Sequence, residues 1–448
     1  MDSVKRVGSS SPEVGVFPSL QVLHIEVMPA LEEFAGGAGT TQWLPCLERL
    51  QISYCPRPRV FSNLPCGLKD VHIDSVGWAA LPELLWQGDN NSLRMSSTSS
   101  LSSLKIMRCE ELVSLAEGLL LHPQLFPSLK KLSISYCEKL THLPIGGFER
   151  FTSLKDLRLM GCPKLWRGST AGKFLPPSLQ FLSVYNCDVL DPLPNAPEDL
   201  NFLHNVVLRC CAIKSLPSEE VLAGWKSVKG LSINDCSEIE SLGGLQALSS
   251  LKSLAISGCS KLVSEGQMEL ASTSFSSSSS SSSSSLILDF LHIDDPALLR
   301  TMPLKSISAR EVQVDFCDEA RSSSLEEWVW RNHTSLQKLI IMKLSSPQFP
   351  LSVHLQSLSS LEFLHITWCN NLRSLPELPS SLKSFWVAIC PLELEESCLR
   401  ESGLEWPKIQ HIPKVKIGCY SKEDLASISP AEHRSRRREL EIQKRKRS

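Results

Sequence analysis

The residues of this chain with the most obvious chemical potential are its 16 cysteines. Eleven of them fall at or within one residue of the ninth position of a repeated sequence pattern: Cys55, Cys109, Cys137, Cys162, Cys187, Cys211, Cys236, Cys259, Cys317, Cys369 and Cys390. Zinc sites need clustered ligands, and this chain has no C-x-x-C pair. A small side chain with a weak S–H donor instead suits a turn, where it bonds carbonyls inside a core. We therefore predict structural thiols that a reducing compartment keeps free.

Other candidates for chemistry are few. GSTAGKF, residues 168–174, is the nearest match to a phosphate-binding loop, but its spacing is one residue short and Phe174 replaces the magnesium-binding hydroxyl. H-E-x-x-H and G-x-S-x-G are absent. Four histidines occupy the fifth position of the repeated pattern: His24, His72, His292 and His365. They are many residues apart, which argues against a shared metal site, so we expect them to be exposed surface histidines. The sequence therefore predicts no catalytic residue, cofactor or metal, and no enzyme.

The repeated sequence pattern also indicates which secondary-structure elements position these residues. Two clear copies are PSLKKLSISYCEKLTHLP at 127–144 and SSLEFLHITWCNNLRSLP at 359–376, and the shared pattern is L-x-x-L-x-[IVL]-x-x-C-x-x-L-x-x-L-P. The copies start at Leu20, Leu47, Leu68, Leu101, Leu129, Leu154, Leu179, Leu203, Val228, Leu251, Leu288, Ala309, Leu336, Leu361 and Leu382. Most starts are 20 to 29 residues apart, which is the period of a leucine-rich repeat and predicts a solenoid.

Each copy should form one short strand. Leu132 and Ile134 alternate with polar residues, so both apolar side chains face the same way. One such strand cannot bury its apolar face alone, whereas a stack of them can. We predict an α/β solenoid, a leucine-rich-repeat horseshoe with a concave parallel β-sheet and an irregular convex side.

The period divides the chain into three predicted parts. Residues 1–15 are an N-terminal lead-in, 16–420 the solenoid of about 15 repeats, and 421–448 a basic C-terminal tail that we expect to be disordered. A serine-rich loop insert is predicted at 272–285, because a serine tract has no apolar surface to bury. The first repeat follows no recognisable cap, which favours a preceding domain, with an atypical self-cap as the alternative. WPKIQHIPKVKIGCY, residues 406–420, is expected to close the stack with a last strand pair.

Charge and hydropathy argue against nucleic-acid binding and against a membrane span. The formal net charge is −2; residues 431–448 hold eight Lys/Arg and three Glu, or +5, so residues 1–430 carry −7. A mildly acidic solenoid is not expected to bind nucleic acid. No apolar run is long enough to span a membrane and no secretory signal is evident, which predicts a cytoplasmic protein without membrane contact. The basic tail is compatible with nuclear import or with a solvated terminus of no specific role.

The remaining functional feature is a surface for protein partners. The third, fifth and seventh positions of each copy should face the concave side, where the last five copies place aromatic, Met and charged residues. Such residues are enriched in interface hot spots, although scattered exposed apolar residues are also ordinary. The candidate partner-binding residues are Phe181, Tyr185, Phe290, His292, Lys338, Ile340, Met342, Phe363, His365 and Trp386.

In its repeated pattern, the chain resembles the leucine-rich-repeat region of plant intracellular nucleotide-binding disease resistance proteins, of the coiled-coil type found in cereals. The resemblance covers roughly 16–420 and rests on FPSLQVLHIEVMPALEEF at 17–34, on the repeated SLxxLxIxxCxxLxxLP line and on LPELPSSLKSF at 375–385. It implies recognition of pathogen effectors or host proteins, and autoinhibition by repeats that contact the nucleotide-binding switch. The motifs of that switch have no match here, so its activity is not implied.

Two other classes of function remain open. Repeats of similar length serve as substrate adaptors of ubiquitin ligases or as other interaction scaffolds, although the 19 residues before Leu20 are too few for an F-box. An extracellular receptor ectodomain is disfavoured by the missing signal peptide and by the free cysteines.

Overall fold

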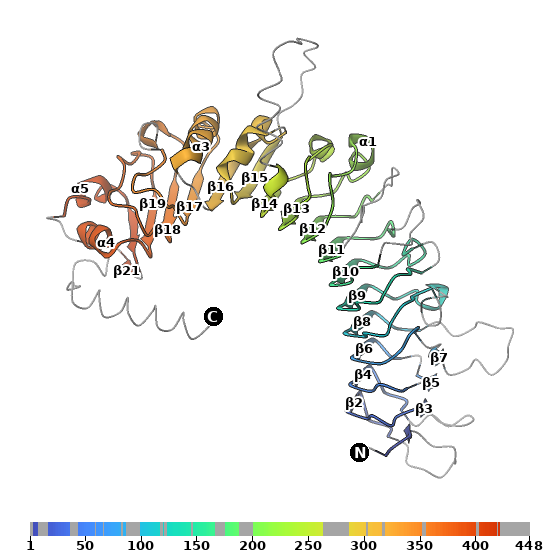
Figure 1. Cartoon of the computed structure of the whole chain (residues 1–448). Coiled ribbons are helices and arrows are strands. Elements are labelled where there is room, and N and C mark those ends of the chain that lie inside the picture. The colour runs from blue at the N-terminus through green and yellow to red at the C-terminus, as the bar shows by residue number, and fades with distance from the viewer. Residues whose placement is uncertain are drawn as a thin grey trace. The chain divides into compact units, whose positions relative to one another are not determined.

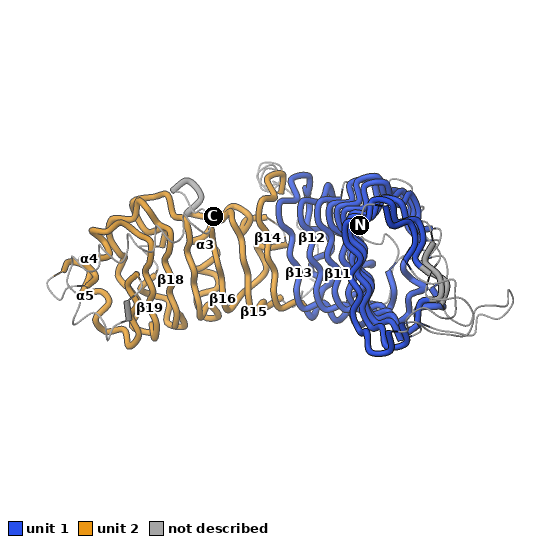
Figure 2. Tube along the Cα trace, turned by 90° about the horizontal axis from the view of Figure 1, so that it is seen from below, with its two compact units in different colours: residues 1–250 blue, residues 251–448 orange. Residues whose placement is uncertain are grey.

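The computed structural model of the chain describes residues 3–7, 17–35, 44–58, 60–65, 67–81, 84–86, 99–116, 120, 123–144, 147–165, 175–187, 200–262, 286–301, 303–315, 319–351, 355–399, 403–418 and 420–421. These residues form two compact units, residues 1–250 and 251–448 (Figure 2). The predicted serine-rich insert at 272–285 and the tail beyond residue 421 lie outside the described residues. The division into lead-in, solenoid and tail therefore stays a prediction.

Unit 1 is built on a ladder of parallel strands (Figure 1). The strands are β2 (Val22–Glu26), β4 (Arg49–Ser53), β6 (Asp70–Asp74), β8 (Ser103–Met107), β9 (Lys131–Ser135), β10 (Asp156–Met160), β11 (Phe181–Tyr185), β12 (Asn205–Arg209) and β13 (Gly230–Asn234). Each pairs with the next in parallel without a register shift. Because corresponding residues stand side by side, a repeat position in the sequence becomes a row across the sheet.

Unit 1 also has a second parallel sheet that the sequence did not predict. It consists of β1 (Arg6–Val7), β3 (Glu33–Ala35), β5 (Val60–Leu64) and β7 (Leu84–Trp86). These strands lie in the returning segments of the first turns, that is, the segments that lead from one ladder strand to the next. Each of the four pairs in parallel with its neighbour through backbone hydrogen bonds. Later in this unit the returning segments include the short helix α1 (Glu219–Leu222) and the 3₁₀ turns η2 (Pro123–Leu125) and η3 (Leu245–Ala247).

Unit 2 continues the same design with more helix. Its strands are β14 (Ser253–Ser257), β15 (Ile287–Ile293), β16 (Ser308–Asp315), β17 (Lys338–Met342), β18 (Phe363–Thr367), β19 (Ser384–Ala388), β20 (Lys414–Ile417) and β21 (Tyr420–Ser421). All pair in parallel except β21, which runs antiparallel to β20 and forms the predicted last strand pair. The returning segments contain η4 (Pro296–Arg300), η5 (Leu304–Ser306), α3 (Glu319–Arg331), η6 (Leu355–Ser357), α4 (Leu392–Leu399) and α5 (Trp406–Ile409).

The core of each unit follows from the leucine spacing. Each predicted start lies within two residues of the first residue of a strand. In β9 the second and fourth residues, Leu132 and Ile134, are 1% and 0% exposed, and Leu129 and Leu140 from the flanking segments are also 0% exposed. Because the same positions are buried turn after turn, one continuous apolar row runs through the stacked repeats of a unit. These observations confirm the predicted parallel-strand solenoid.

Candidate protein-binding surface

The register of unit 2 arranges the predicted partner-binding residues in rows. The third-position row is Phe290, Glu311, Lys338, Phe363, Ser384 and Lys414, and the fifth-position row is His292, Gln313, Ile340, His365, Trp386 and Lys416. Residues between these positions, such as Leu364 and Phe385, are buried in the core. The rows therefore lie on the sheet face opposite the core.

The end of the fifth-position row forms an aromatic stack, defined here as His365, Trp386 and Lys416. The rings of His365 and Trp386 are parallel to within 4°, with centroids 4.1 Å apart. Lys416 Nζ lies 4.4 Å from the centroid of the Trp386 ring, a cation–π contact. Trp386 Nε1 donates a hydrogen bond to the Gly418 carbonyl at 3.2 Å, which fixes the indole further. Trp386 remains 37% exposed, and nearby Phe363 is 42% exposed.

His365 is neutral in this stack at physiological pH. Burial lowers its pKa to about 4, and the positive charges of Lys338 and Lys416 lower the pKa further. Its Nε2 is buried and has no hydrogen-bond partner among the described residues. The imidazole thus acts as an apolar, flat support for Trp386.

A charged group borders the stack at strands β15 to β17. Lys338 Nζ is 2.6 Å from Glu311 Oε1. Asp315 lies 3.5 Å from His292 Nε2 and accepts a hydrogen bond from Gln313 at 3.2 Å. Burial opposes ionisation of Asp315, but the nearby imidazole of His292 and the hydrogen bond from Gln313 outweigh it and hold the pKa of the carboxyl below its ordinary value. The charges of Lys338 and Glu311 are therefore paired within the protein.

The other predicted residues of unit 2 differ in accessibility. Ile340 is only 9% exposed, so it supports the surface more than it presents a contact. Met342 is half-buried and its sulfur lies 3.3 Å from Gln313 Nε2. Phe290 is half-buried, with its ring centroid 6.4 Å from that of His292.

Phe181 and Tyr185 lie on β11 in unit 1, and each is covered by an arginine. The guanidinium of Arg158 is 5.0 Å from the Phe181 ring centroid, and that of Arg209 is 5.6 Å from the Tyr185 ring centroid. Arg158 is itself held by two hydrogen bonds of 2.9 Å to Asp156. Both aromatic side chains are half-buried, which makes them a less accessible pair than Phe363 and Trp386.

The four fifth-position histidines are not the uniformly exposed set that we predicted. His24 is exposed, but His72, His292 and His365 are half-buried. The reason is their position in the row, because side chains of the adjacent repeats flank each ring. For His72, burial and the charge of Lys105 lower the pKa.

Sequence reasoning missed a set of aromatic residues where strands end. Tyr54, Tyr136 and Trp368 are 47%, 45% and 42% exposed and directly precede the repeat cysteines. The guanidinium of Arg108 lies 5.7 Å from the Tyr54 ring centroid, and Arg108 forms a bidentate ion pair with Asp74. Their signal in the sequence is the eighth repeat position, which lies outside the alternation that we used.

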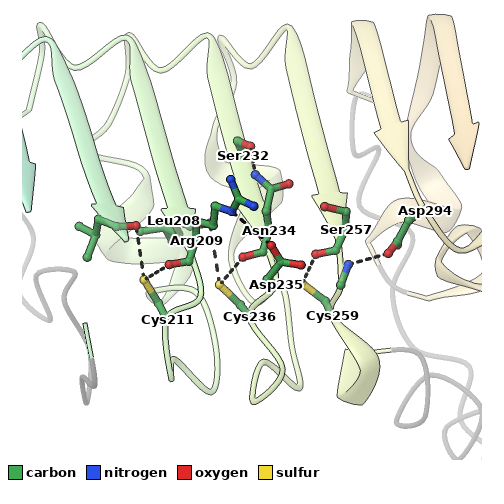
Figure 3. A network of polar contacts seen from close by, with 12 residues as sticks. Leu208, Arg209, Cys211, Ser232, Asn234, Asp235, Cys236, Ser257, Cys259 and Asp294 are labelled. Atoms are coloured by element: carbon green, nitrogen blue, oxygen red, sulfur yellow. Dashed lines mark hydrogen bonds and ion pairs between the residues drawn. The ribbon is translucent and has the colours of Figure 1, made fainter. Parts of the chain in front are cut away.

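The cysteines have the predicted structural role. Cys211 and Cys236 donate to the carbonyls of Arg209 and Asn234 at 3.3 and 3.5 Å (Figure 3). The same bond, to the residue two before the cysteine, recurs at Cys55, Cys109, Cys137, Cys162, Cys187, Cys259, Cys369 and Cys390. Burial raises the pKa of Cys55, so this thiol stays protonated. Cys317 lies outside the described residues.

A stack of parallel strands, one to a repeat, with leucines buried between the turns, defines a leucine-rich-repeat protein. The predicted resemblance to a plant disease resistance protein is confirmed: the chain is 31% identical over 279 residues to putative disease resistance RPP13-like protein 1 of Arabidopsis thaliana. This alignment covers 55% of the chain and 25% of the relative, so the chain matches about a quarter of the relative's length. No protein-family model matches the chain.

Solved structures of leucine-rich-repeat type resemble the chain only loosely. An internalin of Listeria monocytogenes is 13% identical with a TM-score of 0.32, over 77% of this chain and 86% of that one. A leucine-rich-repeat protein of Leptospira interrogans is 16% identical with a TM-score of 0.32, over 87% and 91%. TLR13, in a complex with single-stranded RNA, is 15% identical with a TM-score of 0.35, over 96% and 76%.

The fold and the plant relative support a protein-interaction module. Solenoids of this kind are typically scaffolds that bind through an extended surface and catalyse no reaction. Among the described residues, no helix is long and apolar enough to cross a membrane. In the same part of the chain, no three His, Cys, Asp or Glu side chains are grouped as metal ligands.

Proposed function

We propose that this chain is the recognition and regulatory leucine-rich-repeat module of a plant immune receptor. In this proposal it binds pathogen effectors or host proteins through the surface formed by Phe363 and the aromatic stack. The observation that carries the proposal is the exposed Trp386, which is supported on one face by His365 and on the other by Lys416.

The chemistry of this surface suits a protein partner. Tryptophan and other aromatic residues dominate the binding energy of protein interfaces when they are surrounded by contacts that exclude water. Trp386 is already fixed by ring stacking and by its bond to Gly418, so binding costs it little side-chain entropy. The Lys338–Glu311 ion pair and the polar side chains of His292 and Asp315 would form the polar rim of such an interface.

The regulatory part of the proposal rests on the plant relative. The chain matches about a quarter of the length of that relative, and the resemblance implies a nucleotide-binding switch in the remainder of a full-length receptor. We propose that the solenoid holds that switch inactive until a partner binds. Free cysteines along the described repeats support a reducing compartment, and we place the module in the cytoplasm.

A double substitution tests the proposed surface. Phe363→Ala with Trp386→Ala should abolish binding to a purified partner obtained by crosslinking in infected plant tissue, because both exposed anchors are lost. The affinity is measured by isothermal titration calorimetry, and circular dichroism checks that the fold is kept. Phe202→Ala is the matched control, since Phe202 is 57% exposed in unit 1 and should leave the affinity unchanged. Unchanged affinity in the double variant would remove this surface from the proposal.

A further inference from the structure

A small cavity of about 180 Å³ lies beside α3 in unit 2, away from the rows that carry the aromatic stack. Arg300 of η4, Lys305 of η5 and three residues of α3 (Ser324, Glu327 and Arg331) line it, and Trp328 forms part of its wall. Figure 1 shows α3 on the outer side of strands β16 and β17. The cavity is thus made by returning segments and not by the sheet.

Cations outnumber anions in this lining. Arg300, Lys305 and Arg331 carry three positive charges, and Glu327 is the single carboxylate among the described lining residues. Glu327 forms an ion pair with Arg331 one turn along the helix and lies 3.9 Å from Arg300 Nε. Lys305 has no ion-pair partner within the described part of the chain. The lining therefore keeps a net charge of about +2.

The two arginines of the lining are held in place before any ligand arrives. Arg300 Nη2 donates a hydrogen bond to Ser323 Oγ at 3.0 Å, and Glu327 anchors the guanidinium of Arg331. Trp328 is 2% exposed and its Nε1 donates to the Ile307 carbonyl at 3.1 Å, so this wall is rigid. Within the described part of the chain, these two guanidinium groups keep most of their N–H donors free, and such donors match the oxygens of a phosphate.

From this arrangement we propose that the cavity binds a phosphomonoester group. A dianion neutralises the excess charge of the lining, whereas a carboxylate neutralises only half of it. The cavity is smaller than the sites that enclose drug-sized ligands, so it has room for one phosphate and the first atoms of its ester. The group is carried either by a phosphorylated protein segment or by a small soluble phosphate.

Binding is tested on the full chain with three probes: inorganic phosphate, a short phosphoserine peptide and the same peptide with serine. Binding of each probe is measured by calorimetry and by the shift in melting temperature that it causes. Sodium chloride at the same ionic strength is the control. Arg300→Gln with Lys305→Gln should weaken phosphate binding about tenfold or more, since two charge-assisted contacts are lost. Lys305→Arg should retain binding, and Lys229→Gln, an exposed site in unit 1, should behave as the unchanged protein.

The outcomes separate the two sources of phosphate. Binding of the phosphoserine peptide but not of the serine peptide supports a protein-borne ligand. Binding of inorganic phosphate alone supports a small soluble ligand. Absence of saturable binding by any phosphate probe overturns the proposal, as does equal affinity in the unchanged protein and in a folded Arg300→Gln, Lys305→Gln variant. None of these results depends on Phe363 or Trp386, so this site and the aromatic stack succeed or fail separately.

Discussion

At the scale of single residues, one left-handed backbone position recurs where the strands end. Eleven non-glycine residues have φ between 47° and 62°: Val27, Tyr54, Ser75, Arg108, Tyr136, Asn186, Cys210, Asp235, Lys343, Trp368 and Ile389. The N–H of most of them donates to the last strand residue of the next repeat, as from Tyr136 to the Met160 carbonyl at 2.6 Å. The left-handed residue thus ends one strand and ties it to its neighbour, which explains why strain is accepted there.

Val27 should be the most strained of these positions that is also freely exposed. It is β-branched, has φ 54° and is 58% exposed, so a substitution there loses little packing. Val27→Asn should raise the free energy of unfolding by about 1 kcal/mol, because asparagine adopts left-handed φ at lower cost. Urea denaturation measures the change. Val22→Asn, at a 37% exposed strand position, is the control and should bring no gain; equal effects of the two substitutions would contradict the strain argument.

His365 gives the aromatic stack a defined pH dependence. Its pKa in the folded protein is about 4 against an ordinary 6.5, so between these values the unfolded chain binds more protons and stability rises with pH. The unchanged protein should therefore lose stability relative to His365→Phe as pH falls from 6.5 towards 4. Above pH 7 the difference between the two should be constant. Denaturant titrations at a series of pH values check this, and a difference independent of pH would show that His365 does not titrate as described.

At the scale of elements, the last strands of unit 2 cover what would otherwise be an open sheet edge. β20 pairs in register with β19, and its Val415 and Ile417 are 3% and 0% exposed. Gly418 also accepts the indole hydrogen bond of Trp386, and Lys416 lies over that ring. This element therefore protects an edge and completes the proposed binding surface at the same time.

Removal of this element should be costly. A chain ended after residue 413 loses the burial of Val415 and Ile417, worth roughly 3–6 kcal/mol, and leaves the β19 edge unpaired. We expect a lower melting temperature and concentration-dependent aggregation, measured by scanning calorimetry and light scattering. A chain ended after residue 421 keeps both strands and should match the full chain in melting temperature. If the shorter chain stays monomeric with the same melting temperature, β20 has no protective role.

At the scale of the whole molecule, the strands could be predicted because the repeat encodes them directly. Alternation of Leu132 and Ile134 with polar residues sets both the strand and its buried face. Helix α3 was missed because it lies inside a spacing of ordinary repeat length, although buried Leu325, Trp328 and Val329 have helical spacing. A search for that spacing between the repeat lines would have found it.

The binding surface was only partly predictable from sequence. The period assigns each row of residues, since register follows from equal positions in neighbouring copies. It does not give accessibility, which depends on side-chain direction and on neighbours, so Ile340 and Trp386 were given equal weight although they are 9% and 37% exposed. The cavity beside α3 combines η4, η5 and a helix that the sequence did not predict, so no repeat position indicated it.

The left-handed link between repeats has an evolutionary consequence. Backbone amides, leucines and thiols fix the spacing of the turns, so the exposed side chains on the outward rows of the sheet are not needed to set it. Mutation can therefore vary those rows one residue at a time while the protein still folds. Under the proposed function, such substitutions would change the partner that the surface binds while the scaffold stays the same.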